Sequence, residues 1–401
     1  MFESLKPPPP DPILGLLAAF RNDARAGKID LGIGVYQDEE GRTPVMRAVQ
    51  AAEARLLASQ STKTYQGIAG DPEFNERLLA LLLGATHPVI GEGRVRGVQT
   101  PGGCGALRIG AELIRQSRPG ARVWVSTPTW ANHIPLIGGA GLELKEYPYY
   151  DPRTRGVDFD AMMTALGQVP AGDVVLLHGS CHNPTGADLT PAQWRELATI
   201  ALRQGFTPYV DSAYQGLADG LDADAEGLRH LVSVVPECLL AVSCSKNFGI
   251  YRERVGAVFF LARNSAEADL ALGNAMSAAR RIYSMPPAHG AAVVSMILGD
   301  AALCADWLAE LETVRTRILA MRELLAASLV GNAAGTDFGF IRRQKGMFSF
   351  LGIPPAEVRR LREEFGVYML ESTRINVAGV TPHNIAPLAE ALLQVVGRTP
   401  A

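Results

Sequence analysis

The chain has 401 residues, of which 47% are hydrophobic and 20% are charged. This composition is close to that of ordinary globular proteins, so the chain can bury a sizeable core, and its length allows about two or three domains. The formal net charge of −3 argues against a surface that binds nucleic acid or an anionic membrane. No apolar run approaches the ~20 residues that a bilayer-spanning helix needs.

The N-terminal residues and the cysteines indicate where the protein works. Met1 to Lys6, followed by Pro7 to Pro10, lack the basic-then-apolar order of a secretory signal. The prolines favour polyproline II geometry, and we expect an N-terminal arm over residues 1–12. The five cysteines are odd in number and stand singly, which favours reduced thiols and a cytoplasmic location. His178, Cys181 and His182 resemble part of a zinc site, but no second cysteine pair completes it, so we expect no metal.

The first predicted elements in chain order are mainly helices. Residues 13–26 and about 44–59 have helical spacing, and the short run 31–36 between them is expected to be extended. Residues 63–67 read as a loop that leads into a helix over residues 72–83.

Apolar runs of strand length then recur along the chain. They lie at residues 122–126, 173–178, 206–211, 239–243 and 255–261. Helical segments such as 191–204 separate many of them. Near-continuous apolar strands alternating with helices predict a mostly parallel sheet covered on both faces. Because ligands bind outside the carboxyl ends of such strands, the polar residues there are the candidates for a site.

A long helix and a second α/β unit are predicted after the last of these strands. One face of residues 305–329 carries Leu308, Leu311, Val314, Ile318, Met321 and Leu325. Strands are expected at 338–343, 347–351, 367–370 and 374–377, with helices at 356–365 and 382–396. We therefore expect a large domain of residues 44–313 and a small domain made of residues 13–43 and 314–401.

Lys246 stands where the apolar strand 239–243 runs out into a serine-flanked turn. A lysine at the mouth of a buried strand is partly desolvated, which lowers its pKa. The neutral amine is a nucleophile that can form a Schiff base with a carbonyl. A surface lysine that happens to end a strand is the commoner explanation for any single lysine.

Other strand ends carry polar residues that suit one ligand. Glycines in Thr100–Leu107 open a predicted helix whose free N–H groups could bind phosphate, although an ordinary glycine turn fits as well. The segment does not match the Walker pattern, and no clear strand with G-x-G-x-x-G precedes it, so an NTP or dinucleotide site is poorly supported. Asp211 ends another strand, where it either faces the ligand or caps the next turn. Asn183 precedes Pro184, which restricts it to extended geometry.

Arginines complete this group. Arg252 and Arg254 follow Lys246 closely, and Arg374 lies against an apolar strand without an obvious acidic neighbour. An arginine beside a strand usually has an anion to pair with. A phosphate cradle, an amine, an aspartate and spare arginines at one edge of a sheet are the groups that pyridoxal 5'-phosphate requires.

Motifs along nearly the whole chain closely resemble the class I aminotransferases, in the branch that acts on aspartate and aromatic amino acids. These motifs are Cys181–Gly186, Asp211–Gly216, Ser243–Gly256, Tyr283–Gly290 and Arg374–Gly379. The resemblance implies a fold-type I transferase dependent on pyridoxal phosphate, with a mostly parallel sheet in a large domain beside a smaller α/β domain.

The family pattern implies a role for each matching residue. Lys246 would form the Schiff base and shuttle the substrate's proton. Asp211 would pair with the pyridine nitrogen, with His133 supporting it, while Asn183 and Tyr214 would hydrogen-bond the ring's phenolate oxygen. The catalytic residues would therefore be Lys246, Asp211 and Tyr214.

The remaining implied roles concern the ring face, the phosphate and the substrate. Trp130 would stack on the ring, and Arg254, Ser243 and the backbone of Gly103 and Cys104 would hold the phosphate, with Tyr65 reaching it from the partner in a homodimer. The residues implied for substrate binding are Arg374, Asn183, Gly34, Trp130, the partner's Arg280 and, unless it is simply core, Phe348.

The resemblance implies a transaminase that moves the amino group of aromatic amino acids, and of aspartate and glutamate, to 2-oxoglutarate by a ping-pong mechanism. Two residues depart from the pattern: Cys104 replaces a common threonine or serine, and Met285 replaces an asparagine of aspartate-preferring members. A strict aspartate aminotransferase is the nearest alternative. A β-lyase or decarboxylase on the same scaffold, or a sensor that only binds the cofactor, are further ones.

Overall fold

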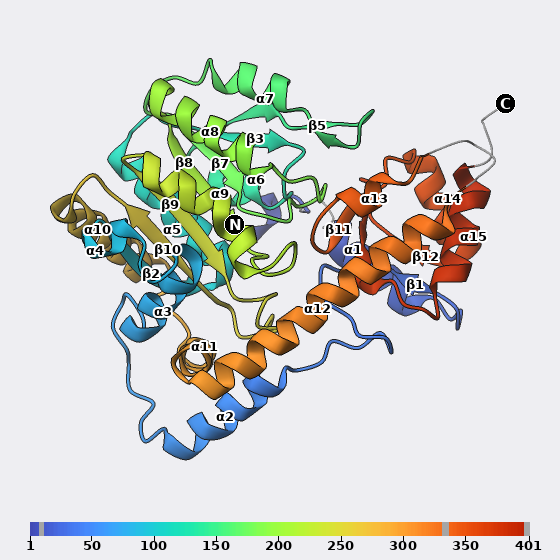
Figure 1. Ribbon diagram of the computed structural model, residues 1–401, viewed down its shortest axis with the longest axis horizontal. Coiled ribbons are helices and arrows are strands. Elements are labelled where there is room, and N and C mark those ends of the chain that lie inside the picture. The colour runs from blue at the N-terminus through green and yellow to red at the C-terminus, as the bar shows by residue number, and fades with distance from the viewer. Residues whose placement is uncertain (8–11, 331–336, 397–401) are drawn as a thin grey trace.

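A seven-stranded sheet forms the centre of the larger part of the molecule (Figure 1). The computed structural model describes residues 1–7, 12–330 and 337–396. The strand order is β2 (Val95–Pro101), β10 (Val255–Leu261), β9 (Cys238–Ser243), β8 (Thr207–Ser212), β7 (Val174–His178), β3 (Arg122–Thr127) and β4 (Glu143–Pro148). Strand β10 is antiparallel to β2 and β9, and the other pairs are parallel, so the predicted mostly parallel sheet is confirmed.

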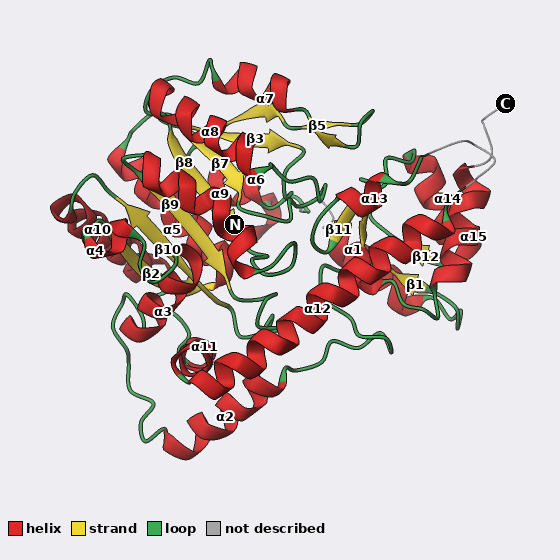
Figure 2. Cartoon of the chain, viewed as in Figure 1, coloured by secondary structure: helices red, strands yellow, loops and turns green. Residues whose placement is uncertain are grey.

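Helices cover both faces of this sheet (Figure 2). Successive residues of β7 show why both faces must be covered: Val174 and Leu176 pack in one core, while Val175 and Leu177 pack in the other. The first core contains α5 (Gly102–Ser117), α6 (His133–Gly138) and α10 (Ser265–Ile282). The second contains α2 (Arg47–Ser59), α3 (Pro72–Leu83), α4 (Pro88–Gly91), α7 (Phe159–Leu166), α8 (Pro191–Gln204), α9 (Leu221–Val234) and α11 (His289–Gly299).

Helix α8 shows how local sequence sets these boundaries. The Thr190 side chain accepts from the Gln193 N–H, and the Gln193 side chain accepts from the Thr190 N–H, which forms a capping box. The helix begins at Pro191, where a missing N–H costs nothing. It ends at Gly205, whose φ of 73° is the left-handed conformation that terminates helices.

A smaller unit has its own hydrophobic core, at the right of Figure 1. In it β1 (Ile29–Asp30) pairs parallel with β12 (Val367–Tyr368), and β11 (Phe348–Phe350) pairs antiparallel with β13 (Arg374–Asn376). Helices α1 (Pro12–Asn22), α13 (Phe340–Arg343), α14 (Pro355–Phe365) and α15 (Ile385–Val396) surround these strands. The Phe20 ring of α1 meets Tyr368 edge to face, with ring centroids 5.3 Å apart, so the N-terminal helix packs against this unit.

Helix α12 (Ala301–Ser328) connects the two cores. Leu311 and Ile318 pack in the core of the large sheet, whereas Met321 and Leu325 pack in the smaller core. The predicted long helix is thus confirmed, but Leu308 is wrongly assigned to its buried face. It is 42% exposed, and its neighbour Trp307 is fully buried, stacked on Phe248 with ring centroids 4.4 Å apart.

Several elements differ from the sequence-based expectation. Residues 338–343 form a turn and the short helix α13 instead of a strand, because the buried Arg322 binds the Ile341 carbonyl that a strand would pair with a neighbour. Strand β2 does precede the glycine turn at residue 102, although only Val95 and Val98 mark it as apolar. Residues 31–36 are irregular, and the extended pairing lies earlier, in β1.

The other elements are short or lie at the edges. A hairpin of β5 (Tyr150–Asp151) and β6 (Gly156–Val157) follows the polar edge strand β4, and 3-10 turns form η1 (Phe2–Ser4) and η2 (Val377–Gly379). Within the described residues, no single helix has the length and apolarity to cross a membrane, and only the sharply bent pair α11 and α12 meets that test jointly.

Candidate active site

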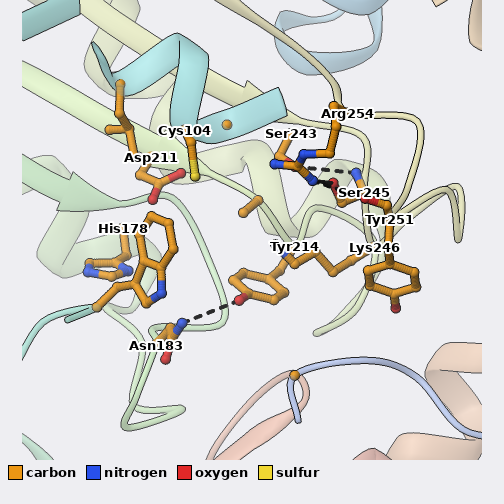
Figure 3. Close-up of a pocket in the computed structure, with 15 residues that line it drawn as sticks. Cys104, His178, Asn183, Asp211, Tyr214, Ser243, Ser245, Lys246, Tyr251 and Arg254 are labelled. Atoms are coloured by element: carbon orange, nitrogen blue, oxygen red, sulfur yellow. Dashed lines mark hydrogen bonds between the residues drawn. The ribbon is translucent and has the colours of Figure 1, made fainter. Parts of the chain in front are cut away.

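A cavity of about 250 Å³ lies at the carboxyl ends of the parallel strands (Figure 3). The sequence predicted most of the residues that line this cavity. It did not predict five of them as site residues: Leu107, His178, Ala213, Ser245 and Tyr251. The signal for two of these was available, since Ser245 and Tyr251 lie inside the Ser243–Gly256 motif. The lining residues are Gly34, Gly103, Cys104, Leu107, Trp130, His178, Asn183, Asp211, Ala213, Tyr214, Ser243, Ser245, Lys246, Tyr251 and Arg254.

Lys246 reaches the cavity from the turn after β9. Burial lowers the pKa of its amine, and the carboxylate of Asp211 opposes that shift only in part. Its Nζ lies 4.9 Å from the centre of the Tyr214 ring. A buried amine with a lowered pKa is more often neutral, which is the form that attacks a carbonyl.

Asp211 ends β8 at the opposite end of the cavity from Arg254 (Figure 3). Burial pushes the pKa of its carboxyl up, but the hydrogen bond from His133, 2.9 Å from Oδ2, and nearby positive charge outweigh this and hold the pKa below its usual value. His133 is fully buried, and its Nδ1 lies 2.8 Å from Thr129 Oγ1. The site therefore presents a fixed anion suited to a protonated ring nitrogen.

Asn183 and Tyr214 face one another across the cavity. The Asn183 Nδ2 donates to the Tyr214 hydroxyl at 3.4 Å, drawn as a dashed line in Figure 3. Burial raises the pKa of Tyr214, so its phenol remains neutral and can donate a proton in a hydrogen bond.

Arg374 lies behind Asn183 and has spare donors. Its Nη1 donates to Asn183 Oδ1 at 3.3 Å and its Nη2 to the Gly32 carbonyl at 2.7 Å, but its buried Nε has no partner. No acidic side chain pairs with it among the described residues, and the guanidinium sits 4.3 Å from the centre of the Phe348 ring. A buried arginine with an unused N–H is suited to a carboxylate ligand.

Gly102 and Arg254 form a cradle at the start of α5. Gly102 has a φ of 70°, and a Cβ there would lie 2.6 Å from Arg254 Nη2. Arg254 donates to the Tyr251 carbonyl at 3.0 Å and to Ser245 Oγ at 3.4 Å, and no acidic group pairs with it in the described ranges. Free helix N–H groups beside an unpaired arginine suit a phosphate.

These groups fit pyridoxal 5'-phosphate. The cradle would take the phosphate, Asp211 the ring nitrogen and Lys246 the aldehyde carbon. The close approach of Arg254 to Gly102, which leaves no room for a Cβ, and the unpartnered Nε of Arg374 are the structural observations that support the fit.

Some sequence-predicted residues lie outside this cavity. Tyr65 is 89% exposed on the loop between α2 and α3, and Arg280 is exposed near the end of α10. Phe348 is 2% exposed and packs edge-on to Tyr214, below Arg374, so it supports the cavity and does not line it.

The histidines next to Asn183 are bound by hydroxyl groups. His182 Nε2 lies 3.1 Å from Ser126 Oγ, and its Nδ1 lies 2.9 Å from Thr185 Oγ1. The His178 ring is tilted by 37° against that of His182, with ring centroids 4.0 Å apart, and burial lowers the pKa of His178 to about 3. No group of three or more potential ligands in the described part of the chain could hold a metal ion.

Known proteins match the chain over nearly its full length. Residues 26–392 match the family model of the class I and II aminotransferases. The aspartate aminotransferase of Escherichia coli K12 is 50% identical, covering 99% of this chain and 100% of its own length. The aromatic-amino-acid aminotransferase of Paracoccus denitrificans is 49% identical, covering 98% and 100%.

A solved structure agrees with these relatives. The aromatic-amino-acid aminotransferase from Burkholderia pseudomallei, covalently bound to pyridoxal phosphate, superposes with a TM-score of 0.96 at 41% identity and covers 99% of each chain. The chain therefore belongs to the class I and II aminotransferases, and it is a fold-type I transaminase that depends on pyridoxal 5'-phosphate.

Proposed function

We propose that the protein transfers the amino group of aromatic amino acids, and of aspartate and glutamate, to 2-oxoglutarate by a ping-pong mechanism. The observation that carries this proposal is one cavity that joins Lys246, with its lowered pKa, to anionic Asp211 and to the cradle at Arg254, with Arg374 adjoining it.

Each residue has a chemical task that follows from its surroundings. Pyridoxal phosphate, when bound, supplies an electron-accepting ring that stabilises negative charge on the substrate's Cα and carries the amino group between the two half-reactions. Asp211 holds a proton on the ring nitrogen, which keeps the ring electron-accepting. Lys246 Nζ would take the proton from the substrate's Cα as a general base and, once protonated, would return it as the general acid of the same half-reaction. Arg374 and Asn183 orient the substrate through its α-carboxylate.

The preference for aromatic donors rests on the relatives and on one residue. Proteins named aromatic-amino-acid and tyrosine aminotransferases are 42–50% identical to this chain. Met285, where aspartate-preferring members have asparagine, is partly buried near the end of α10. Arg280 on that helix is hydrogen-bonded to Ser284 Oγ. We infer that methionine at position 285, which offers no amide group to bind Arg280, lets that arginine move aside for an aromatic ring.

Separate half-reactions test this proposal. We expect tyrosine, phenylalanine and aspartate each to convert the cofactor's absorption at rates within about two orders of magnitude of one another. A tyrosine rate negligible beside that of aspartate would refute the aromatic preference. The second candidate would then hold, a strict aspartate aminotransferase, which the 50% identity to the Escherichia coli enzyme supports.

We also propose a homodimer in which Tyr65 and Arg280 act in the partner's site. Both side chains are exposed in the single chain, as are the apolar Phe2 and Leu5 near the N-terminus, at 73% and 70%. Sedimentation measurements should give twice the chain mass, and a monomer would exclude this arrangement.

We also propose a division into domains and a location in the cell. The division into an arm (1–12), a large domain (44–313) and a small domain (13–43 with 314–401) is supported by the two separate cores and by α12, which passes from one to the other between Ile318 and Met321. The arm includes residues 8–11, which lie outside the described residues. A cytoplasmic location is supported by five free cysteines.

A further inference from the structure

Asp188 closes the loop that carries Asn183 into the cavity. Its carboxylate accepts two backbone hydrogen bonds, from the Cys181 N–H at 2.6 Å and from the His182 N–H at 2.8 Å. One charged group therefore binds the N–H groups of the two residues that immediately precede Asn183.

This part of the loop needs such support. Cys181 has a φ of 51°, in the left-handed region, where a side chain crowds the following carbonyl oxygen and the backbone is strained. Hydrogen bonds to an ionised acceptor are about twice as strong as neutral ones, so the carboxylate can offset this strain.

The rest of the loop is anchored by other groups. The Lys345 N–H donates to the Gly186 carbonyl at 2.6 Å, and the Tyr149 hydroxyl donates to the Ala187 carbonyl at 2.7 Å. These contacts hold residues 186 and 187. His182 has further hydrogen bonds, from its ring to Ser126 and Thr185 and from the Gly186 N–H to its carbonyl at 2.7 Å, so the distinct contribution of Asp188 is to bind the backbone N–H groups of Cys181 and His182.

Asp188 is the only acidic residue in the segment 181–188. Burial raises the pKa of its carboxyl to about 6, the neighbouring Asp224 adds to that shift, and the two N–H groups and Lys345 oppose it. Near neutral pH the carboxylate is therefore ionised, so both of its oxygens are acceptors.

Small movements of Asn183 would matter. Its hydrogen bonds to Tyr214 and Arg374 measure 3.4 and 3.3 Å, at the long end of the usual range. A shift of a few tenths of an ångström at Cys181 and His182 would break them, and with them the alignment of Asn183 toward the cavity.

We propose that Asp188 is a positioning residue, which holds the amide of Asn183 in the pose that contacts both the cofactor ring and Arg374. This rests on the proposed role of Asn183 beside the phenolate oxygen of pyridoxal phosphate. Donation from Asn183 would stabilise the negative charge on that oxygen. If Asn183 is misplaced, the Lys246 nitrogen that binds the cofactor should become harder to deprotonate.

The test compares the wild-type holoenzyme with the Asp188→Asn variant. Asparagine has the same size as aspartate, but its side chain has one acceptor oxygen, so its NH2 group would face one of the two backbone N–H groups. We expect the pH midpoint of the cofactor's absorption change to rise by about one unit. The Kd of succinate, a non-reactive dicarboxylate, should rise about tenfold. Asp173→Asn is the matched control, because Asp173 is also buried and binds the Arg122 N–H, but at the other end of β7.

A double variant separates positioning from general stability. If Asp188 acts through Asn183, adding Asp188→Asn to Asn183→Ala should shift the midpoint little further, because the two changes remove the same interaction. Equal midpoints in Asp188→Asn and the wild type, with only a lowered melting temperature as in Asp173→Asn, would overturn the proposal. So would additive shifts in the double variant.

Two further outcomes are informative. If Asp188→Asn gives no folded holoenzyme, Asp188→Glu replaces it, since the longer side chain cannot keep both bonds without moving Cys181. A midpoint unchanged in Asp188→Glu would also overturn the proposal. A wild-type protein without any titrating cofactor absorption would instead refute the proposed function.

Discussion

At the scale of single residues, burial sets the reactivity of this site. Lys246 has a lowered pKa because it is withdrawn from water, while Asp211 stays anionic because His133 outweighs the same effect. The two groups lie in one cavity, so each receives the protonation state that proton transfer at Cα requires.

We expect Lys246→Ala to bind pyridoxal phosphate without a covalent bond and to lose activity by about 10⁴-fold or more, because both the nucleophile and the proton carrier are gone. Absorption spectra and borohydride reduction followed by peptide mass analysis measure this. Lys145→Ala is the control, since Lys145 pairs with Glu143 on the edge strand. Borohydride labelling of another lysine in the wild type would contradict the assignment.

The two arginines should divide the substrate between them. Arg374→Ala should lower kcat/KM for every donor by about 10²-fold, because it removes a charge-assisted contact to the α-carboxylate. Arg280→Ala should lower kcat/KM by a similar factor for aspartate and leave tyrosine within about threefold. Steady-state kinetics with both donors decide this, and equal losses for tyrosine and aspartate in Arg280→Ala would contradict the distal-carboxylate role.

At the scale of elements, the junction between β2 and α5 controls cofactor binding. Gly102→Ala would place a Cβ 2.6 Å from Arg254 Nη2 and so displace that arginine. We expect the Kd of the cofactor to rise by about 10–100-fold, measured by titrating the apoprotein. Gly120→Ala is the matched control, because Gly120 has a φ of 87° but nothing within 4 Å of the added atom. A similar Kd in both variants would show that backbone strain, not the clash, decides the result.

Helix α12 supports the small unit through the fully buried Arg322. The guanidinium donates to the carbonyls of Ile341 at 3.0 Å and Gly346 at 2.7 Å, and to Ser349 Oγ at 2.7 Å. We expect Arg322→Ala to cost about 3 kcal/mol or more, because buried carbonyls lose their partners.

Thermal unfolding measures this cost. Arg315→Ala, on the same helix, removes only the ion pair with Glu312 and should cost about 1 kcal/mol or less. A similar fall in Tm for the two variants would mean that the carbonyls find other donors.

At the scale of the whole molecule, the proposed dimer can be tested by complementation. Neither Lys246→Ala nor Arg280→Ala alone should use aspartate well. In a mixed dimer, one site combines Lys246 from one subunit with Arg280 from the other. Statistical mixing should therefore restore about a quarter of the wild-type aspartate activity. Activity that stays at the level of the separate variants after exchange would contradict the shared site.

The sequence by itself determined the strongly periodic elements, and it predicted most of the residues that line the cavity. The apolar runs of β7, β8 and β9 are long enough to be read directly, because both of their faces are buried. The motif around Lys246 is specific because several of its side chains, Ser243, Lys246 and Arg254, line the cavity together. Strand β2 was not predicted, and the residues of α13 were wrongly predicted to form a strand. Both segments are weakly patterned, and their conformation depends on partners far along the chain.

Only the tertiary structure decided which of these residues meet. Asn183 and Arg374 are 191 positions apart and share a hydrogen bond, and Asp188 reaches back to Cys181 and His182 across a turn that no periodicity marks. Trp307, not Leu308, is buried because the packing of α12 against the large core sets its rotation. A local pattern fixes what a segment can bury, whereas contacts between distant segments depend on how the whole chain packs.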